Sequence, residues 1–167
     1  FSAQQNVSLQ PLSFAQIPYP LPMNTITVNG YKMAYGDNGN QGEAVVFLHG
    51  WKGNLLAYSA LFPGMKKANL RVIAVDYIGN GKSDKPAAPA FHTMAFKAKS
   101  VMMLMKKLGV KKAHLVGHSM GGVVASIFAL NYPELTGSIT LLGPAGMVKI
   151  PPQAIAAAKK SRSEERR

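Results

Sequence analysis

The sequence predicts an α/β protein whose sheet is twisted and mostly parallel, with helices on its faces and a β-hairpin before it. Four short apolar runs are separated by stretches with helical spacing, which is typical of parallel strands joined by helical crossovers. An Asn29-Gly30 pair between two segments of alternating apolar and polar residues predicts the hairpin. A Gly-x-Ser-x-Gly motif after the third apolar run indicates where chemistry could take place.

The composition fits one globular domain with a substantial core. The 167 residues are 47% hydrophobic and 16% charged. No apolar run approaches the ~20 residues that cross a bilayer, so no membrane span is predicted. The 19 Lys and Arg against 7 Asp and Glu give a charge of +12, but the lysines are scattered in pairs without an arginine-rich motif. This pattern predicts a solvated basic surface and no nucleic-acid partner.

Three segments differ in composition. Residues 1–24 are rich in Pro, Gln and Ser and predict an extended N-terminal arm, residues 25–148 predict the α/β core, and residues 149–167 predict a basic, Ala-rich helix. The chain has no cysteine, which excludes disulfides and thiolate metal sites, and we expect neither a metal nor a cofactor. The compartment stays unknown; because the chain begins at Phe1, a secreted or periplasmic protein is one expectation and a shortened chain is the other.

The elements of the core follow from the spacing of apolar residues. Residues 25–35 predict the hairpin, and the four apolar runs predict buried strands over 44–50, 71–76, 111–119 and 138–142. Helices are expected within 51–69, over Met94–Leu108 and over Gly121–Tyr132. In an open parallel sheet, ligands bind beyond the carboxyl ends of the strands. We therefore expect the turns that follow the first three buried strands to lie on the functional edge.

The stretch HLVGHSMGG predicts a nucleophile elbow. A buried strand leads into it and a helix follows, so Ser119 would stand at the carboxyl edge of the sheet beside a helix N-terminus. Small residues at Gly117, Gly121 and Gly122 let strand and helix approach closely around this turn. Ser119 is therefore the predicted catalytic nucleophile.

Two backbone amides are candidates for an oxyanion hole. One is the amide of Met120, which follows the serine, and the other is the amide of Trp51 in the LHGW turn after the first buried strand. Gly50, Trp51 and His118 lie beside the serine in this arrangement, and we expect them to contact the substrate.

Four separated motifs, VVFLHGW, IAVDYIGNGKSDKP, HLVGHSMGG and ITLLGPAG, resemble the first half of an α/β-hydrolase of the esterase, haloperoxidase and carbon–carbon-bond hydrolase branch. The resemblance covers about residues 25–146 and implies Ser119 as nucleophile, with the Trp51 and Met120 amides as the oxyanion hole. It also implies a catalytic acid and a histidine on loops after later strands, positions not found in this sequence. The fold is thus expected to be truncated before its last strands, with residues 149–167 resembling the start of a cap.

None of the four histidines is a convincing substitute for that base. His114 lies five residues before Ser119 on the same strand, about 16 Å away. His118 is adjacent to the serine, and neighbouring strand side chains point to opposite faces. His49 sits at a tight turn that suits a structural role, which leaves His92 as the least implausible stand-in. Among the carboxylates, Asp76 ends a strand at the correct edge, where a loop-anchoring role is expected.

Two functions from different classes remain open. The first is a serine hydrolase acting on a small ester or other acyl substrate, whose histidine and acid come from a lost segment, a second chain or a partner copy. The second is a non-catalytic hydrolase-like module for binding or assembly. An exposed apolar edge at Ser138–Leu142 would drive the pairing with another chain.

Overall fold

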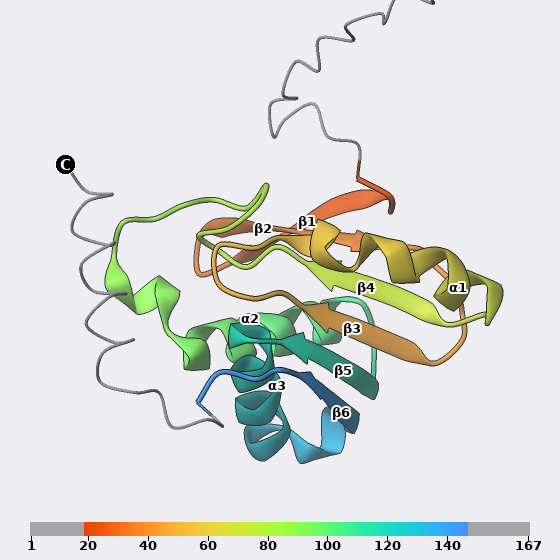
Figure 1. Cartoon of the computed structure of the whole chain (residues 1–167). Helices are drawn as coiled ribbons and strands as arrows, with labels where there is room; N and C mark the ends of the chain where they lie inside the picture. Colours follow the sequence, from red (N-terminus) through yellow and green to blue (C-terminus); the bar gives the residue numbers. More distant parts are fainter. Residues whose placement is uncertain (1–18, 147–167) are drawn as a thin grey trace, which may run out of the picture.

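The computed structural model describes residues 19–146, which form a mixed six-stranded sheet with helices on both faces (Figure 1). The strand order is β1-β2-β4-β3-β5-β6. The first two strands are antiparallel to each other, β2 is antiparallel to β4, and the remaining pairs are parallel. The strands are β1 (Met23–Val28), β2 (Tyr31–Asp37), β3 (Ala44–Leu48), β4 (Arg71–Val75), β5 (Ala113–His118) and β6 (Thr136–Leu142).

The hairpin is confirmed at the predicted place. Its turn is made by Asn29 and Gly30, both with positive φ (48° and 83°), which is the geometry of a type I′ turn. Val28 pairs with Tyr31 on either side of it. The first strand begins at Met23, inside the segment predicted as the arm. Residues 1–18 of that arm and the helix predicted over 149–167 lie outside the described residues.

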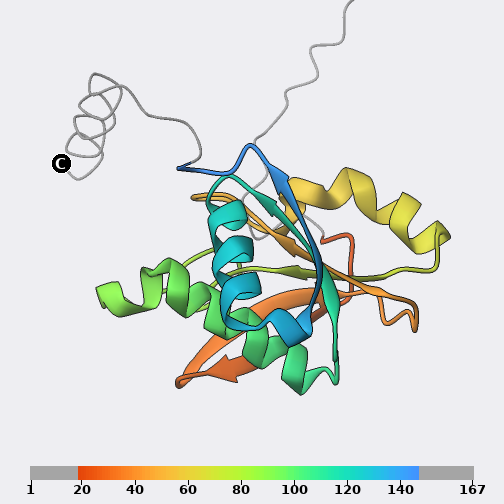
Figure 2. The ribbon, with the colours of Figure 1, turned by 90° about the horizontal axis from the view of Figure 1, so that it is seen from below.

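The helices cover the two faces of the sheet unequally. The 3₁₀ helix η2 (Leu55–Leu61) and α1 (Phe62–Lys67) lie on one face. The longer α2 (Met94–Lys107) and α3 (Met120–Asn131) lie on the other, where Figure 2 shows them beside each other. Two short 3₁₀ helices, η3 (Pro89–His92) and η4 (Pro133–Leu135), complete the connections.

Alternation along the buried strands produces two separate cores. In β3 the side chains of Val46 and Leu48 pack in the cluster under α2 and α3. Val45 and Phe47 pack in the cluster under η2 and α1. A strand covered on both faces must be apolar at every position, which is why the sequence shows a continuous run and no alternation.

The last strand corrects one prediction and agrees with another, the exposed apolar edge at Ser138–Leu142. Residues 138–142 were expected to form a buried strand, and β6 does pair in parallel with β5. Five of its seven residues are nevertheless exposed, including Ile139 and Leu142. Leu130 on the neighbouring α3 is 82% exposed. The apolar composition was read correctly, but within residues 19–146 nothing covers this edge.

The connections after β3 and β5 mark the carboxyl ends of these two strands as the place where a crevice is expected in this class of sheet. From β3 the chain leaves towards α1 on one face, and from the adjacent β5 it leaves towards α3 on the other. Neighbouring strands whose connections depart to opposite faces form a topological switch point, where ligands bind in this class of sheet. The turn after β3 and the corner after β5 therefore face each other.

Candidate active site

Ser119 stands alone between a strand and a helix. The strand β5 ends at His118 and α3 begins at Met120, leaving Ser119 with φ 52° and ψ −116°. A non-glycine residue avoids this backbone region, because its Cβ then crowds the neighbouring peptide groups. Such strain persists only where the surroundings enforce it, and it is typical of functional positions.

Backbone hydrogen bonds on both sides hold Ser119 in this strained conformation. The Ser119 N–H donates to the Leu142 carbonyl oxygen at 3.1 Å, which ties the corner to the end of β6. Its own carbonyl oxygen accepts from the N–H groups of Gly122 at 3.0 Å and Ala145 at 3.1 Å. The segment that follows β6 therefore belongs to the structure of the nucleophile corner.

Three glycines make the corner possible, as the sequence predicted. A Cβ on Gly117 would overlap the backbone of Gly121, and a Cβ on Gly121 would overlap the Leu48 carbonyl oxygen. A Cβ on Gly122 would lie 2.7 Å from the Cβ of Pro144. The first turn of α3 therefore rests directly on the end of β3.

The turn after β3 approaches the serine closely. A Cβ on Gly50 would lie 3.0 Å from Nδ1 of His118 and 3.4 Å from the Cβ of Ser119. The Gly50 carbonyl oxygen accepts from the Gly53 N–H at 3.1 Å and lies 2.7 Å from Nδ1 of His49. Since a peptide group is planar, these two contacts also fix the direction of the Trp51 N–H.

The predicted oxyanion donors thus come from two adjoining elements. The Met120 amide is the first of α3, a position that has no partner one turn earlier in the helix. The Trp51 side chain is 58% exposed, with Nζ of Lys52 5.1 Å from its ring centroid. An exposed aromatic ring therefore lies in the turn after β3. The sequence predicted Trp51 as a substrate contact, together with Gly50 and His118.

His49 has a structural position. It is fully buried, its ring centroid lies 4.5 Å from that of Tyr77, and Nδ1 donates to the Gly50 carbonyl. Burial lowers its pKa from 6.5 to about 4, because the charged imidazolium would lose its hydration. The ring is therefore neutral at neutral pH, and its Nδ1 is occupied in holding the turn.

The other histidines do not serve Ser119 either. His114 lies at the opposite edge of the sheet, with Nδ1 2.8 Å from the Ser138 hydroxyl and Nε2 3.8 Å from the Glu43 carboxylate. His92 directs Nε2 to the Pro86 carbonyl oxygen at 2.8 Å. His118 is exposed and lies beside Gly50. Within residues 19–146, no histidine ring is hydrogen-bonded to Ser119.

Asp76 anchors loops, as expected. Its buried carboxylate accepts from the Leu55 N–H at 2.8 Å, the Lys82 N–H at 2.9 Å and the Tyr19 hydroxyl at 3.2 Å. Three donors from three segments hold the loops around the crevice to the end of β4. Burial, together with the negative charge of the Asp76 carboxylate beside it, raises the pKa of the Tyr19 phenol.

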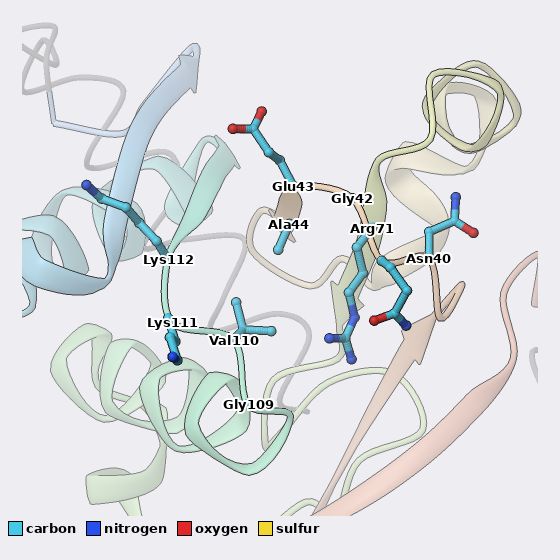
Figure 3. Close-up of a pocket in the computed structure, with 10 residues that line it drawn as sticks. Asn40, Gly42, Glu43, Ala44, Arg71, Gly109, Val110, Lys111 and Lys112 are labelled. Atoms are coloured by element: carbon cyan, nitrogen blue, oxygen red, sulfur yellow. The ribbon is translucent and has the colours of Figure 1, made fainter.

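A cavity at the amino edge of the sheet is separate from this site. It has a volume of about 280 Å³ and is lined by the loops before β3 and β5 (Figure 3). Arg71 is held there by Asp37 through Nη2 and Oδ2 at 2.7 Å. The charged groups of Arg71 and Lys112 do not converge on one point (Figure 3). The described part of the chain holds no cluster of three His, Asp or Glu side chains suited to a metal, and none of its helices has the length and apolar character needed to cross a bilayer.

Residues 43–162 match a protein family described as the alpha/beta hydrolase fold. The chain belongs to this family. It is 39% identical over 128 residues to a 2-hydroxy-6-oxononadienedioate/2-hydroxy-6-oxononatrienedioate hydrolase from Comamonas testosteroni, an alignment that covers 75% of the chain and 44% of the relative. The chain therefore spans less than half the length of the curated relatives it matches.

Solved structures show the same fold. A probable hydrolytic enzyme from Pseudomonas aeruginosa is similar with a TM-score of 0.73 and 31% identity, over 80% of this chain and 45% of that one. An N-acyl homoserine lactone degrading enzyme is similar with a TM-score of 0.72 and 28% identity, over 83% of this chain and 53% of that one. The predicted membership of the α/β-hydrolase fold is confirmed.

Sequence reasoning missed two residues beneath the site. Tyr77 and Lys97 are buried next to each other, with Nζ of Lys97 5.0 Å from the tyrosine ring centroid. A signal for Lys97 was present, because it shares a helical face with Val101 and Leu104 at spacings of four and seven residues.

Proposed function

We propose that this chain supplies the nucleophile and the oxyanion hole of a serine hydrolase that acts on an ester or another acyl substrate. The observation that carries the proposal is the backbone of Ser119, held at φ 52° and ψ −116° between β5 and α3. A strained serine at this corner of an α/β-hydrolase sheet presents its hydroxyl to the carboxyl-edge crevice. The close approach of Gly50 to the Cβ of Ser119 supports the next residue, Trp51, as the second amide of the proposed hole.

The proposed reaction begins with attack of the Ser119 Oγ on the substrate carbonyl carbon. A carbon–oxygen bond forms, and the π electrons of the carbonyl move to its oxygen. The N–H groups of Met120 and Trp51 would stabilise that oxyanion as its charge develops. The hydroxyl proton passes to a histidine, which residues 19–146 do not supply. We propose that this histidine and its acid lie on a further polypeptide segment, a second chain or a partner copy.

The names of the relatives suggest substrates for comparison. One relative is a hydrolase of 2-hydroxy-6-oxo dienedioates, and one structural neighbour degrades an N-acyl homoserine lactone. Both names describe molecules with a carbonyl group that a serine could attack. Gly50, Trp51 and His118 are the residues that we propose to contact such a group in this chain.

The test is labelling by a fluorophosphonate, which reacts with activated serines. We expect labelling at Ser119 in the longest native form of the protein, and its complete loss in Ser119→Ala. Ser126→Ala is the matched control, because Ser126 lies on the same helix and donates to the Gly122 carbonyl at 3.0 Å. Labelling that survives Ser119→Ala, or that is absent from the longest native form, contradicts the proposal.

A second candidate is favoured by the exposed edge. Within residues 19–146, the β6 strand and Leu130 of α3 leave apolar side chains uncovered. Such an edge suits a non-catalytic module that binds or assembles with another chain. In that case Ser119→Ala would leave the biological activity unchanged, and sedimentation would show a dimer or complex.

A further inference from the structure

Two polar atoms beneath the site lack hydrogen-bond partners among the described residues. They are Nε2 of His49 and the hydroxyl oxygen of Tyr77, and both are fully buried. Their rings are in contact, with centroids 4.5 Å apart. Buried polar atoms are nearly always paired with protein or with ordered water, so two orphans in one place require an explanation.

The hydrogen-bonding roles of His49 follow from its other nitrogen. Nδ1 lies 2.7 Å from the Gly50 carbonyl oxygen, which can only accept, so Nδ1 carries the hydrogen. A neutral ring with hydrogen on Nδ1 has a bare acceptor at Nε2. That atom therefore needs a donor, and no described group provides one.

Lys97 brings unused donors into the same region. Its side chain is in the first turn of α2 and only 4% exposed, with a single hydrogen bond of 3.4 Å from Nζ to the Ile78 carbonyl oxygen. No carboxylate within residues 19–146 forms an ion pair with it. An ammonium has three N–H donors, so two remain. The helix N-terminus also disfavours a cation, which makes this an unusual place for a lysine.

We propose that Lys97 is a positioning residue for the oxyanion hole, and that it acts through one internal water shared with the Tyr77 hydroxyl and Nε2 of His49. The demands of the three groups are complementary: Lys97 donates, His49 accepts, and Tyr77 can do either. None of the three groups is hydrogen-bonded to another, so one small polar molecule bound between them would satisfy all three. A buried water with three polar partners is the usual solution.

The peptide group between Gly50 and Trp51 links this water to the proposed oxyanion hole. A water that accepts from Lys97 and donates to Nε2 favours the form of His49 with its hydrogen on Nδ1, where it donates to the Gly50 carbonyl. That carbonyl and the Trp51 N–H belong to the same planar unit, so holding one directs the other. Lys97 and Tyr77 therefore support the donor at Trp51 without touching the substrate. The catalytic part of this inference rests on the proposed function, whereas the water and the tautomer do not.

The experiment combines crystallography and NMR on the full 167-residue chain. We expect a crystal structure at high resolution to show one water within about 3.2 Å of Nζ of Lys97, the Tyr77 oxygen and Nε2 of His49. Side-chain ¹⁵N spectra should show His49 with hydrogen on Nδ1 and a hydrogen-bonded Nε2. In Tyr77→Phe and Lys97→Met the Nε2 resonance should move towards that of an unbonded acceptor nitrogen.

The control variant is Ser100→Ala, which removes another buried hydroxyl of α2. That hydroxyl donates to the Phe96 carbonyl at 2.8 Å and does not contact the three groups. The His49 spectrum should stay unchanged in it. A dry site, a hydrogen on Nε2, or an Nε2 resonance that stays still in both Tyr77→Phe and Lys97→Met overturns the proposal. If Lys97→Met does not fold, Tyr77→Phe decides alone, because it removes one oxygen and keeps the ring.

A second readout separates this inference from the proposed function. Where the native protein is labelled by a fluorophosphonate, we expect the labelling rate constant to fall roughly tenfold in Tyr77→Phe and Lys97→Met, since the Trp51 amide is then less well placed. If the protein contains the water but is not labelled, the proposed serine hydrolase function is contradicted and the inference about the water is not. Labelled protein with a dry site, or with unchanged rates in both variants, contradicts the positioning role alone.

Discussion

At the carboxyl edge of the sheet, Ser119 has a strained backbone and two buried polar atoms have no partner within the described residues. At the amino edge, Arg71 and His114 have side-chain partners. Arg71 binds Asp37 at 2.7 Å, and His114 contacts Ser138 and Glu43. Both edges are made by the ends of the same strands. The backbone strain and the unpaired buried polar atoms thus lie together at the carboxyl edge, as expected of a functional site.

The largest expected effect comes from the close packing at the carboxyl edge. Gly121→Ala would place a Cβ onto the Leu48 carbonyl oxygen, a backbone atom that cannot move alone. We expect the free energy of unfolding to fall by about 3–5 kcal/mol, measured by urea denaturation. Gly64→Ala in α1 meets open space and should change the free energy by less than about 1 kcal/mol. Equal midpoints for the two variants would show that the corner is not tightly packed.

The next effect is the acid sensitivity of His49. Its pKa is about 4 in the folded chain and 6.5 ordinarily, so between these values the unfolded chain binds a proton that the folded chain does not. The stability is fully present above about pH 6.5 and is lost as the pH falls to about 4, a difference of about 3 kcal/mol. Urea unfolding at about pH 7 and pH 4.5 measures it.

His49→Asn is the matched variant for that experiment, because its amide N–H can still donate to the Gly50 carbonyl while the side chain does not titrate. Its stability should change less between the two pH values than that of the native chain. If the native chain and the variant lose the same stability on acidification, other groups are responsible.

A smaller effect of opposite sign is expected at the nucleophile. Ser119→Gly removes the Cβ that makes φ 52° unfavourable, and the relief exceeds the extra entropy of an unfolded glycine. We expect the variant to be more stable by about 1 kcal/mol in thermal denaturation and to lose fluorophosphonate labelling. Ser126→Gly, in the middle of α3, should instead lose about 1 kcal/mol. A destabilised Ser119→Gly would mean that the corner is not strained.

The smallest effect belongs to the amino edge. Asp37→Asn removes the ion pair with Arg71 while it keeps an oxygen for the Gly39 N–H. Because the pair is partly exposed, we expect a loss of about 1 kcal/mol or less, reduced further at high salt. Denaturation at low and high salt concentration measures both. A loss as large as that of Gly121→Ala would remove the contrast between the two edges.

Most of the fold could be predicted because local patterns decided it. The continuous apolar runs predicted β3, β4 and β5, and the Asn29-Gly30 pair predicted the hairpin turn. For β6 the sequence supported two expectations, a buried strand and an exposed apolar edge, because apolar composition shows that a strand can be buried but not whether anything is present to cover it. Lys97 was missed for a related reason, since a charged side chain is assigned to the surface unless its partners are known.

The sequence by itself determined the family, the strands and helices of the core, and the place of Ser119 between a strand and a helix, because each depends on residues that are neighbours along the chain. Only the tertiary structure decided that Gly50 reaches Ser119, that His49 holds the Gly50 carbonyl, and that Lys97 lies beneath them. These contacts join β3, β5 and α2, which lie far apart in the sequence and meet only when the helices pack on the sheet. The strain at Ser119 likewise comes from contacts with Leu142 and Ala145, which lie more than twenty residues further along the chain.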